Sequence, residues 1–369
     1  MIEMKGSSSR AFVRRIVSTV RCLTRFVSIV ARLLLLIQCG NRSLFLLQRK
    51  GLRRKERSGF MDYVVALMFI VFGFTLLVKG ADLFVDHASG VARKIGIPPL
   101  VVGLTIVAFG TSMPELAVSV TAALEGHNEI AVGNVVGSNI FNLLVVAGAS
   151  ACLFPLVTNR TILYRDWPIS TAMALVLAVF LWPDMHISRG EAAVLFLVFV
   201  AILLFQIRAG KKEGGNGEVE ENRSMIRLLT FLVIGIAGII IGAQLSVNGA
   251  TSIARLLGVS ESLIGLTIVA VGTSLPELVT SVVAARKGEN EIALGNVIGS
   301  NIFNICCILG ISAFLRPITV EATAMFDTLF LAAISLVFWI MCRWKKLDWK
   351  LGSVMVLTYV GYMVYIILR

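Results

Sequence analysis

GLTIVAFGTSMPELAVSV begins at Gly103, and a second copy, GLTIVAVGTSLPELVTSV, begins at Gly265, 162 residues further along the chain. The copies continue into AVGNVVGSNIFN, ending at Asn142, and ALGNVIGSNIFN, ending at Asn304. Without any gap, 30 of the 40 paired positions are identical. Each copy places one glutamate, Glu115 or Glu277, directly after a proline in an otherwise apolar segment. An acid among apolar neighbours is costly, so both glutamates are candidates for function.

The composition around these stretches is that of a membrane protein. Of the 369 residues, 57% are hydrophobic and 15% are charged, and the mean hydropathy is +0.87. A soluble domain carries about 25% charged residues. Several apolar runs approach the roughly 20 residues with which a helix crosses a bilayer, and they lack the short alternation of membrane strands. The sequence therefore predicts an all-α polytopic membrane protein, with the lipid bilayer as its partner.

The net charge of +12 comes entirely from the N-terminal segment. Residues 1–60 hold 14 Lys and Arg against two acids, whereas residues 61–369 hold 20 of each sign. This location removes the argument for an acidic partner, and no nucleic-acid binding is predicted. We interpret residues 1–60 as a basic N-terminal extension that is dispensable, disordered or not native, with the working protein beginning at Met61. The alternatives are a basic surface arm, or an eleventh span built around LLLLI from Leu33.

Ten membrane helices are predicted after Met61, in two units of five. The first unit covers residues 61–208, a hydrophilic linker covers 209–225, and the second unit covers 226–369. The repeat extends beyond the motifs 103–142 and 265–304, because Gly80-Ala81 recurs at Gly242-Ala243. Five is an odd number, so the second unit must enter the membrane from the opposite side. We expect two inverted repeats, as in secondary transporters, with the second and seventh helices broken at their prolines.

Basic residues predict the orientation. The loops on the side of the central linker hold 15 Lys and Arg, and those on the opposite side hold four. The positive-inside rule then places the linker in the cytoplasm, and we expect a multi-pass protein of the cell (inner) membrane.

The break before each glutamate predicts a cage of oxygen atoms. A proline cannot donate to the helix ladder, and in a bilayer the freed carbonyls must find partners in protein or water. The freed carbonyls would point to where nearby hydroxyls and the carboxylate converge, and such a set suits hard cations, Ca²⁺ or Na⁺. The residues concerned are Ala108, Thr111, Ser112 and Glu115 in the first copy, and Ala270, Thr273, Ser274 and Glu277 in the second.

The GSNIFN segments extend this cage. Ser138 and Asn142 are four residues apart and share a helix face, as do Ser300 and Asn304. We expect two glutamates, two asparagines and several hydroxyls to meet between the halves. Packing is the predicted role of the motif glycines, Gly133, Gly137, Gly295 and Gly299.

Other polar residues are weaker candidates. Asp82, Asp86 and His87 follow the apolar part of the first span, where they would line an access path or simply lie at a solvated helix end. The cysteines and histidines have no spacing typical of zinc sites or of a disulfide framework. No enzyme activity and no cofactor are predicted.

With these residues in view, the chain resembles the sodium/calcium exchanger family of cation/calcium antiporters, particularly its prokaryotic members. The resemblance covers residues 61–369. It implies that Glu115 and Glu277 are the central metal ligands, completed by hydroxyls, Asn142 and the carbonyl oxygens of Ala108 and Ala270. Some relatives carry Asp at the position of Asn304, so this site has two formal negative charges rather than three.

The function expected from the resemblance is export of Ca²⁺ in exchange for Na⁺ by alternating access, in a monomeric unit. The transported ions are substrates. The alternative is an H⁺/Ca²⁺ antiporter of the same fold, because a carboxyl at low dielectric can take a proton instead of an ion. An uncoupled cation channel is less favoured, since inverted repeats with paired broken helices are typical of transporters. Any role for K⁺ and the stoichiometry are left open.

Overall fold

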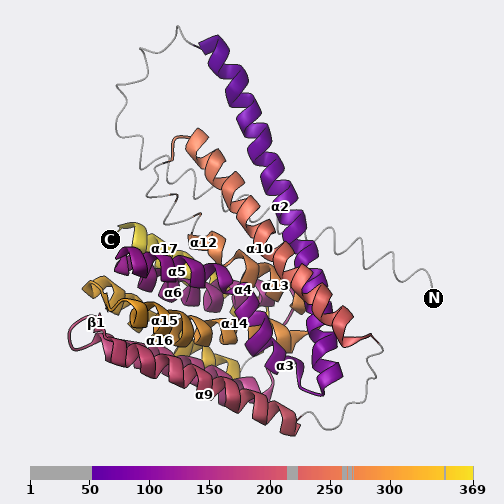
Figure 1. Ribbon diagram of the computed structural model, residues 1–369, viewed down its shortest axis with the longest axis vertical. Coiled ribbons are helices and arrows are strands. Elements are labelled where there is room, and N and C mark those ends of the chain that lie inside the picture. Colours follow the sequence, from indigo (N-terminus) through magenta and orange to yellow (C-terminus); the bar gives the residue numbers. More distant parts are fainter. Residues whose placement is uncertain are drawn as a thin grey trace. The chain divides into compact units, whose positions relative to one another are not determined.

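The computed structural model describes residues 52–213, 223–259, 264, 268, 270–344 and 346–368. Two compact units are present, Met1–Met61 and Asp62–Arg369, and both motif copies lie in the second. The predicted extension lies almost entirely outside the described residues. The described part of the chain is helical, apart from one short pair of strands (Figure 1).

In the first half the elements are α2 (Leu52–Ile95), α3 (Pro99–Val102), η1 (Gly103–Val107, π-helical), α4 (Ala108–Thr111), α5 (Met113–Glu125), α6 (Asn128–Phe141), η2 (Asn142–Val146, π-helical), α7 (Ala147–Leu153), η3 (Ile162–Asp166, π-helical), α8 (Trp167–Leu181), β1 (His186–Ile187) and α9 (Arg189–Glu213). In the second half they are α10 (Met225–Leu256), α12 (Ala270–Thr273), α13 (Leu275–Arg286), α14 (Asn290–Ile302), η5 (Phe303–Ile308, π-helical), α15 (Leu309–Leu315), β2 (Ile318–Thr319), α16 (Ala322–Trp344) and α17 (Trp349–Leu368).

Eight helical stretches in the described part are long and apolar enough to cross a membrane, and a bent pair makes a ninth. The bent pair is Pro99–Thr111 with Met113–Glu125, which meet at 51°. This is the second predicted span, and its break is confirmed. The seventh predicted span falls partly on residues outside the described part, so the count of ten and the inverted repeat stay predictions.

The motif helices form the centre of the second unit. In the span Asn290–Leu315, 89% of the most apolar window is buried, and in Asn128–Leu153 the figure is 72%. By contrast, Arg189–Gly210 is 17% buried and Trp349–Leu368 is 22% buried. The helices that carry GNVVGSNIFN and GNVIGSNIFN are therefore enclosed by the others, which leave apolar faces for lipid.

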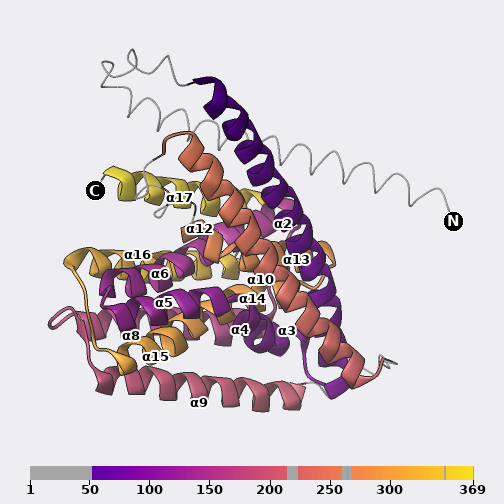
Figure 2. The ribbon, with the colours of Figure 1, turned by 45° about the horizontal axis from the view of Figure 1, so that its top comes forward.

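Helices α2 and α10 pack tightly against each other along one side of this core (Figures 1 and 2). A Cβ atom at Gly242 would lie 2.5 Å from the backbone nitrogen of Leu77, and one at Gly80 would lie 2.8 Å from that of Ile239. Small residues allow such close approach of two membrane helices. Only glycine fits at these positions, and its lack of a side chain lets α2 and α10 pack closely. We call these two helices the α2/α10 pair.

Glycines also end the helices at equivalent points of the repeat. Gly96 and Gly258 follow α2 and α10 with φ values of 67° and 79°. Gly126 and Gly288 follow α5 and α13 with φ values of 89° and 79°. This left-handed conformation is accessible to glycine at low cost and terminates a helix by satisfying its last carbonyls.

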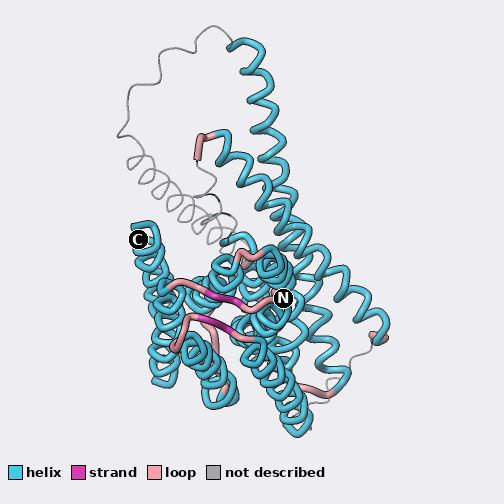
Figure 3. Tube along the Cα trace, turned by 60° about the vertical axis from the view of Figure 1, so that its left-hand side comes forward, coloured by secondary structure: helices cyan, strands magenta, loops and turns pink. Residues whose placement is uncertain are grey.

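The two strands join the halves at one end of the helices. β1 and β2 are antiparallel, with His186 opposite Thr319 and Ile187 opposite Ile318 (Figure 3). A hydrogen bond of 3.0 Å links the His186 ring nitrogen Nδ1 to the Thr319 hydroxyl. Ile187 and Ile318 are fully buried, so the pairing adds an apolar contact between segments that are distant in sequence.

Candidate cation-binding site

The helix breaks lie at serines, two residues before each proline. Ser112 has φ −87° and ψ 12°, and Ser274 has φ −91° and ψ 8°, outside the helical region. Pro114 and Pro276 then lie in the first turns of α5 and α13, where a missing N–H costs little. Glu115 and Glu277 also lie in these first turns. Their carboxyl groups are thus placed at the positive ends of two helices, which favours negative charge there.

The two glutamates are held by serines of the opposite half. The Ser274 hydroxyl donates to Glu115 Oε1 at 3.0 Å, and the Ser112 hydroxyl donates to Glu277 Oε1 at 2.8 Å. All four side chains have no exposed surface. The reciprocal bonds bring the two motif copies together, as the sequence predicts, and interlock the breaks in α4–α5 and α12–α13.

Several buried oxygen atoms of the motif residues have no hydrogen-bond partner in the described part of the structure. The second carboxylate oxygens of Glu115 and Glu277 are among them. Buried polar atoms are normally hydrogen-bonded, so a cluster of unsatisfied oxygens indicates a place for a ligand. The other unsatisfied side-chain atoms from the predicted site are Asn142 Nδ2 and Oδ1, Ser300 Oγ and Asn304 Oδ1.

The remaining predicted ligands fall into three groups. The Thr111 hydroxyl donates to Asn296 Oδ1 at 3.0 Å, and Ser138 is buried on α6. Thr273 is half-buried at the end of α12. Ala270 begins α12, and its side chain lies outside the described part.

Ala108 differs from the expectation of a freed carbonyl. Its oxygen accepts a hydrogen bond from the backbone N–H of Ser112 at 3.0 Å, so the helix break does not release it. The Thr111 hydroxyl approaches the same oxygen at 3.4 Å. Ala108 therefore has less capacity for a cation than the sequence suggests.

Four asparagines that the sequence reasoning did not select build the frame of the site. Asn296 accepts from the Thr111 hydroxyl at 3.0 Å and donates to the backbone oxygen of Glu277 at 3.3 Å. Asn134 donates to the backbone oxygen of Glu115 at 3.2 Å in the same way. Each therefore fixes the backbone that carries one glutamate. Their recurrence in both GNV segments was the available signal.

Asn139 and Asn301 join the GSN segments of the two halves. The Asn139 side chain donates to the backbone oxygen of Asn301 at 3.1 Å, and Asn301 donates to that of Asn139 at 3.3 Å. Asn304 also donates to Asn139 Oδ1 at 3.0 Å, whereas Asn142 has no such bond in the described part. The pseudo-symmetric asparagines Asn142 and Asn304 are thus placed in different environments.

The predicted packing glycines behave differently in the two halves. Cβ atoms at Gly295 and Gly299 would lie 3.0 Å from Leu100 O and 2.6 Å from Leu104 O, which confirms their close approach to the first broken helix. Gly133 and Gly137 have no described atom within 4 Å. The repeat equivalents of Leu100–Leu104 are residues 262–266, which lie largely outside the described part. The packing role of these two glycines stays a prediction.

A helical membrane protein with two buried acids, set in paired helix breaks on motifs that carry further unsatisfied oxygens, has the features of the class of ion transporters. Comparison with known proteins identifies it further. Residues 65–208 and 227–368 match the family model described as sodium/calcium exchanger protein. The chain belongs to this family.

The chain matches similar proteins over almost their full lengths. The sodium/calcium exchanger MaX1 of Methanosarcina acetivorans is 37% identical over 345 residues, covering 81% of this chain and 98% of that protein. The inner membrane protein YrbG of Escherichia coli is 36% identical, covering 82% and 96%. The solved structure of the sodium-calcium exchanger NCX_Mj, soaked with Na⁺ and Sr²⁺, gives a TM-score of 0.73 at 30% identity and covers 82% of this chain and 98% of its own. The family, the membrane-spanning helical fold and cation/Ca²⁺ antiport are thereby supported together.

Proposed function

We propose that this protein exports Ca²⁺ across the cell membrane in exchange for Na⁺. The observation that carries the proposal is the pair Glu115 and Glu277, both without exposed surface and each with one carboxylate oxygen that lacks a partner in the described part. Membership of the sodium/calcium exchanger family supports Ca²⁺ and Na⁺ as the two cations. Both ions are substrates.

The charge of the site fits one divalent cation. Among the described residues, the ion pairs of Arg165, Arg286 and Lys287 involve neither Glu115 nor Glu277. Two carboxylates without a basic partner repel each other, and one Ca²⁺ neutralises both. Oxygen ligands from carboxylates, amides and hydroxyls are those that Ca²⁺ prefers. Na⁺ would occupy the same oxygens one charge at a time, which makes simultaneous occupation unfavourable and supports exchange.

The proposed ligands are the residues that the sequence selects. Glu115 and Glu277 are central, and Asn142, Ser300 and Asn304 of the same motif pair carry further buried oxygens without a partner in the described part. The set is completed by Ser112, Ser274, Ser138, Thr111 and Thr273, with the carbonyl oxygen of Ala270 and, as a weaker ligand, that of Ala108, which already accepts from the Ser112 N–H.

Transport by alternating access requires a part that moves and a part that stays. The α2/α10 pair is joined by its glycines into one body, whereas α6 and α14 are enclosed at the centre. We propose that the α2/α10 pair slides or tilts against the motif helices and opens the site to one side at a time. The central linker would lie in the cytoplasm, as the distribution of basic residues predicts, and a single chain would be the working unit.

Proton coupling is the second candidate. Two neighbouring buried carboxyls without a basic partner can also be relieved by one proton, because burial disfavours the charged form. The same residues would then bind Ca²⁺ in one direction and a proton in the other.

Flux measurements distinguish these mechanisms. The purified full chain in proteoliposomes should accumulate ⁴⁵Ca²⁺ when a Na⁺ gradient is imposed, and a Ca²⁺ gradient should drive Na⁺ uphill. Accumulation driven only by a pH gradient would establish proton coupling instead. Downhill Ca²⁺ flux that cannot drive Na⁺ uphill would identify a channel and refute exchange.

A further inference from the structure

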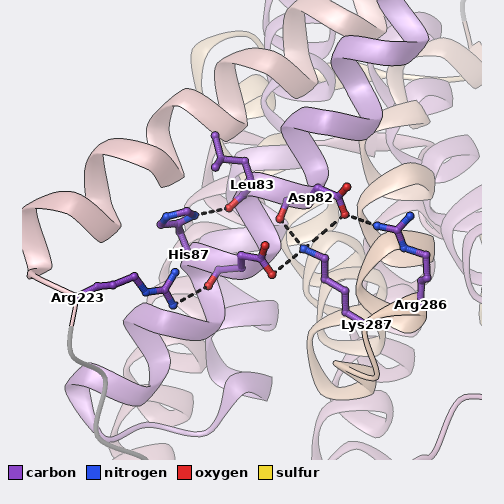
Figure 4. A network of polar contacts seen from close by, with 7 residues as sticks. Asp82, Leu83, His87, Arg223, Arg286 and Lys287 are labelled. Atoms are coloured by element: carbon purple, nitrogen blue, oxygen red, sulfur yellow. Dashed lines mark hydrogen bonds and ion pairs between the residues drawn. The ribbon is translucent and has the colours of Figure 1, made fainter. Parts of the chain in front are cut away.

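Four charged side chains outside the cation site join the C-terminal part of α2 to the end of α13. Arg286 donates to Asp82 Oδ1, and Lys287 Nζ lies 2.6 Å from Asp86 Oδ1 and 3.4 Å from Asp82 Oδ1. Lys287 also donates to the backbone oxygen of Asp82 at 2.7 Å. Figure 4 shows Asp82 between Arg286 and Lys287, with His87 one turn further along α2. We call the four residues Asp82, Asp86, Arg286 and Lys287 the α2–α13 ion cluster.

The cluster lies at the end of the molecule where the central linker returns to α10. Arg223, the residue that follows the undescribed part of the linker, donates to the backbone oxygen of Asp86 at 3.5 Å (Figure 4). Lys94, near the end of α2, donates to the backbone oxygen of Arg223 at 2.7 Å. We call this end the linker face. At the linker face the cluster therefore connects the α2/α10 pair to the core helix α13.

The sequence repeat does not preserve the cluster at the four equivalent positions. At the offset of 162, Asp82 and Asp86 become Gln244 and Asn248 on α10, while Arg286 and Lys287 become Leu124 and Glu125 on α5. The residues equivalent to the two acids are uncharged. Those equivalent to the two bases are an apolar residue and an acid.

The described contacts made by the residues at these equivalent positions agree with the absence of an ion cluster there. Gln244 donates to Asn248 of its own helix at 3.3 Å. The end of α5 is held by Arg316, which donates to the backbone oxygen of Leu124 at 2.9 Å and follows the core helix α15. The Arg316 contact joins core helix to core helix, so among the described residues the ion cluster between the α2/α10 pair and the core lies at the linker face.

We propose that the α2–α13 ion cluster is a one-sided latch that closes the linker face and biases the exchanger towards the states in which that face is shut. The proposal rests on the alternating access proposed above. In an inverted repeat the two open states are related by exchange of the two halves, so similar halves would give them similar energies. A contact made by one half only lowers the energy of one set of states.

The size of the bias follows from exposure. The side chains of Lys287, Asp82 and Arg286 are 20%, 27% and 32% exposed, and that of Asp86 is 57% exposed. Ion pairs with this access to solvent are individually weak, so the latch must open readily in each cycle. We expect it to shift the balance between states about two- to tenfold, enough to set sidedness without stopping transport.

The first test separates the two faces. Sealed membrane vesicles of opposite orientation, carrying either the full wild-type chain or Arg286→Gln with Lys287→Gln, are used to measure the half-saturating Ca²⁺ concentration on each face. Without the latch this concentration should fall about two- to tenfold on the linker face and rise on the opposite face. Lys350→Gln, a charge loss on α17, is the matched control and should change neither. Equal changes on both faces, or none, would overturn the latch.

Charge exchange distinguishes a latch from a structural role. Lys287→Asp places a third acid beside Asp82 and Asp86 and should give the unlatched pattern. Adding Asp86→Lys to that variant restores an opposite-charge pair and should restore the wild-type ratio between the faces. Failure of this rescue in a stably folded double variant would count against the latch.

Grafting the cluster onto the other face should reverse the bias of the wild type between the two faces. Gln244→Asp with Asn248→Asp supplies the acids, and Leu124→Arg with Glu125→Lys supplies the bases. Leu124 is 55% exposed, so the longer side chain has room. In the variant that carries the graft and lacks the native bases, the half-saturating Ca²⁺ concentration should fall on the linker face and rise on the opposite face, beyond the loss of the native bases alone. A ratio unchanged by the graft would contradict a latch that acts by position.

A measurement without transport separates this proposal from the proposed function. Amide hydrogen exchange of the purified full chain should become faster at residues 82–97 in Arg286→Gln with Lys287→Gln, and stay unchanged at residues 244–258. If the variant and the wild type show the same rate of amide hydrogen exchange at residues 82–97, the latch is overturned, even if the wild type transports Ca²⁺ against Na⁺. A wild type that transports neither ion would refute the proposed function. The amide hydrogen exchange would still decide whether the ion cluster holds α2 against α13.

Discussion

At the scale of single residues, the site consists of two carboxylates held across the two halves. Each glutamate takes one hydrogen bond from the serine of the other half and keeps one oxygen unsatisfied in the described part. The serine bonds fix where the carboxylates point, and the remaining oxygens are available to a cation. Positioning and binding are thus divided between the two oxygens of each carboxylate.

Neutralising either glutamate should abolish Ca²⁺ transport. In Glu115→Gln or Glu277→Gln the side-chain shape is kept but one of two buried charges is lost, and an amide is a weaker ligand for Ca²⁺ than a carboxylate. We expect the initial rate of ⁴⁵Ca²⁺ uptake in proteoliposomes to fall at least about 100-fold, as expected when the charge that binds a divalent ion is removed. Glu125→Gln, at the exposed glutamate that ends the same helix, should transport normally. Near-normal uptake by either site variant would refute the proposed site.

Removing the serine hydroxyls should weaken the site by similar amounts in both halves. Ser112→Ala and Ser274→Ala each leave a buried carboxylate oxygen without its donor, and a lost bond to a charged group costs about 1.5–3 kcal/mol. The half-saturating Ca²⁺ concentration should therefore rise about ten- to 100-fold in each variant. Ser252→Ala serves as the control, because the Ser252 hydroxyl donates to the backbone oxygen of Asn248 in its own helix. A large effect in one half alone would contradict a reciprocal arrangement.

At the scale of elements, two kinds of contact divide the molecule. The motif helices are broken and interlocked by polar bonds, whereas α2 and α10 are long, continuous and packed through glycines. The polar bonds fix the positions of Glu115 and Glu277, and the close glycine packing keeps α2 and α10 together. This contrast is what a fixed core and a moving pair require.

Enlarging a glycine between α2 and α10 should separate the pair. A Cβ at Gly242 would lie 2.5 Å from Leu77 N and 2.6 Å from Gly73 O, both backbone atoms that cannot yield without moving a helix. Gly242→Ala should lower the midpoint of thermal unfolding, in line with about 1–3 kcal/mol for overpacking, and reduce transport. Gly361→Ala, where no described atom lies within 4 Å, should match the wild type. An unaltered Gly242→Ala protein would show that α2 and α10 are not in tight contact.

At the scale of the whole molecule, all the matched sequence lies after residue 64. The family model begins at residue 65, and the net charge of the chain lies before residue 61. The membrane-spanning part therefore carries equal numbers of basic and acidic residues, and the cation site lies entirely within it.

A chain that begins at Met61 should insert and transport like the full chain. The cation site and the α2–α13 ion cluster are both formed by residues after this point, so the shortened protein keeps each of them. Expression in membranes and Na⁺-driven ⁴⁵Ca²⁺ uptake, compared with the full chain at equal protein, provide the check. Loss of uptake in a correctly inserted shortened chain would show that residues 1–60 contribute to function.

The class of the protein and the identity of its site can be read from the residues in order along the chain. Apolar runs of membrane length indicate helices that lie in lipid. A motif that is repeated at a fixed offset and carries an acid among apolar residues indicates a functional site rather than packing. Glu115, Glu277 and the serines before them could be selected for this reason. The positions of the helix breaks were nearly correct, since a proline restricts the turn in which it lies.

Which groups partner one another depends on the packed structure. The local pattern could not predict that Ser112 donates to Glu277 rather than to Glu115. It also could not predict that Ala108 keeps its backbone hydrogen bond, or that Asn296 fixes the backbone of Glu277. The different environments of Asn142 and Asn304, and the ion cluster on one face, arise where two similar halves pack with unequal neighbours. A local pattern contains no information on such pairings, because distance in space is set by the whole packed chain.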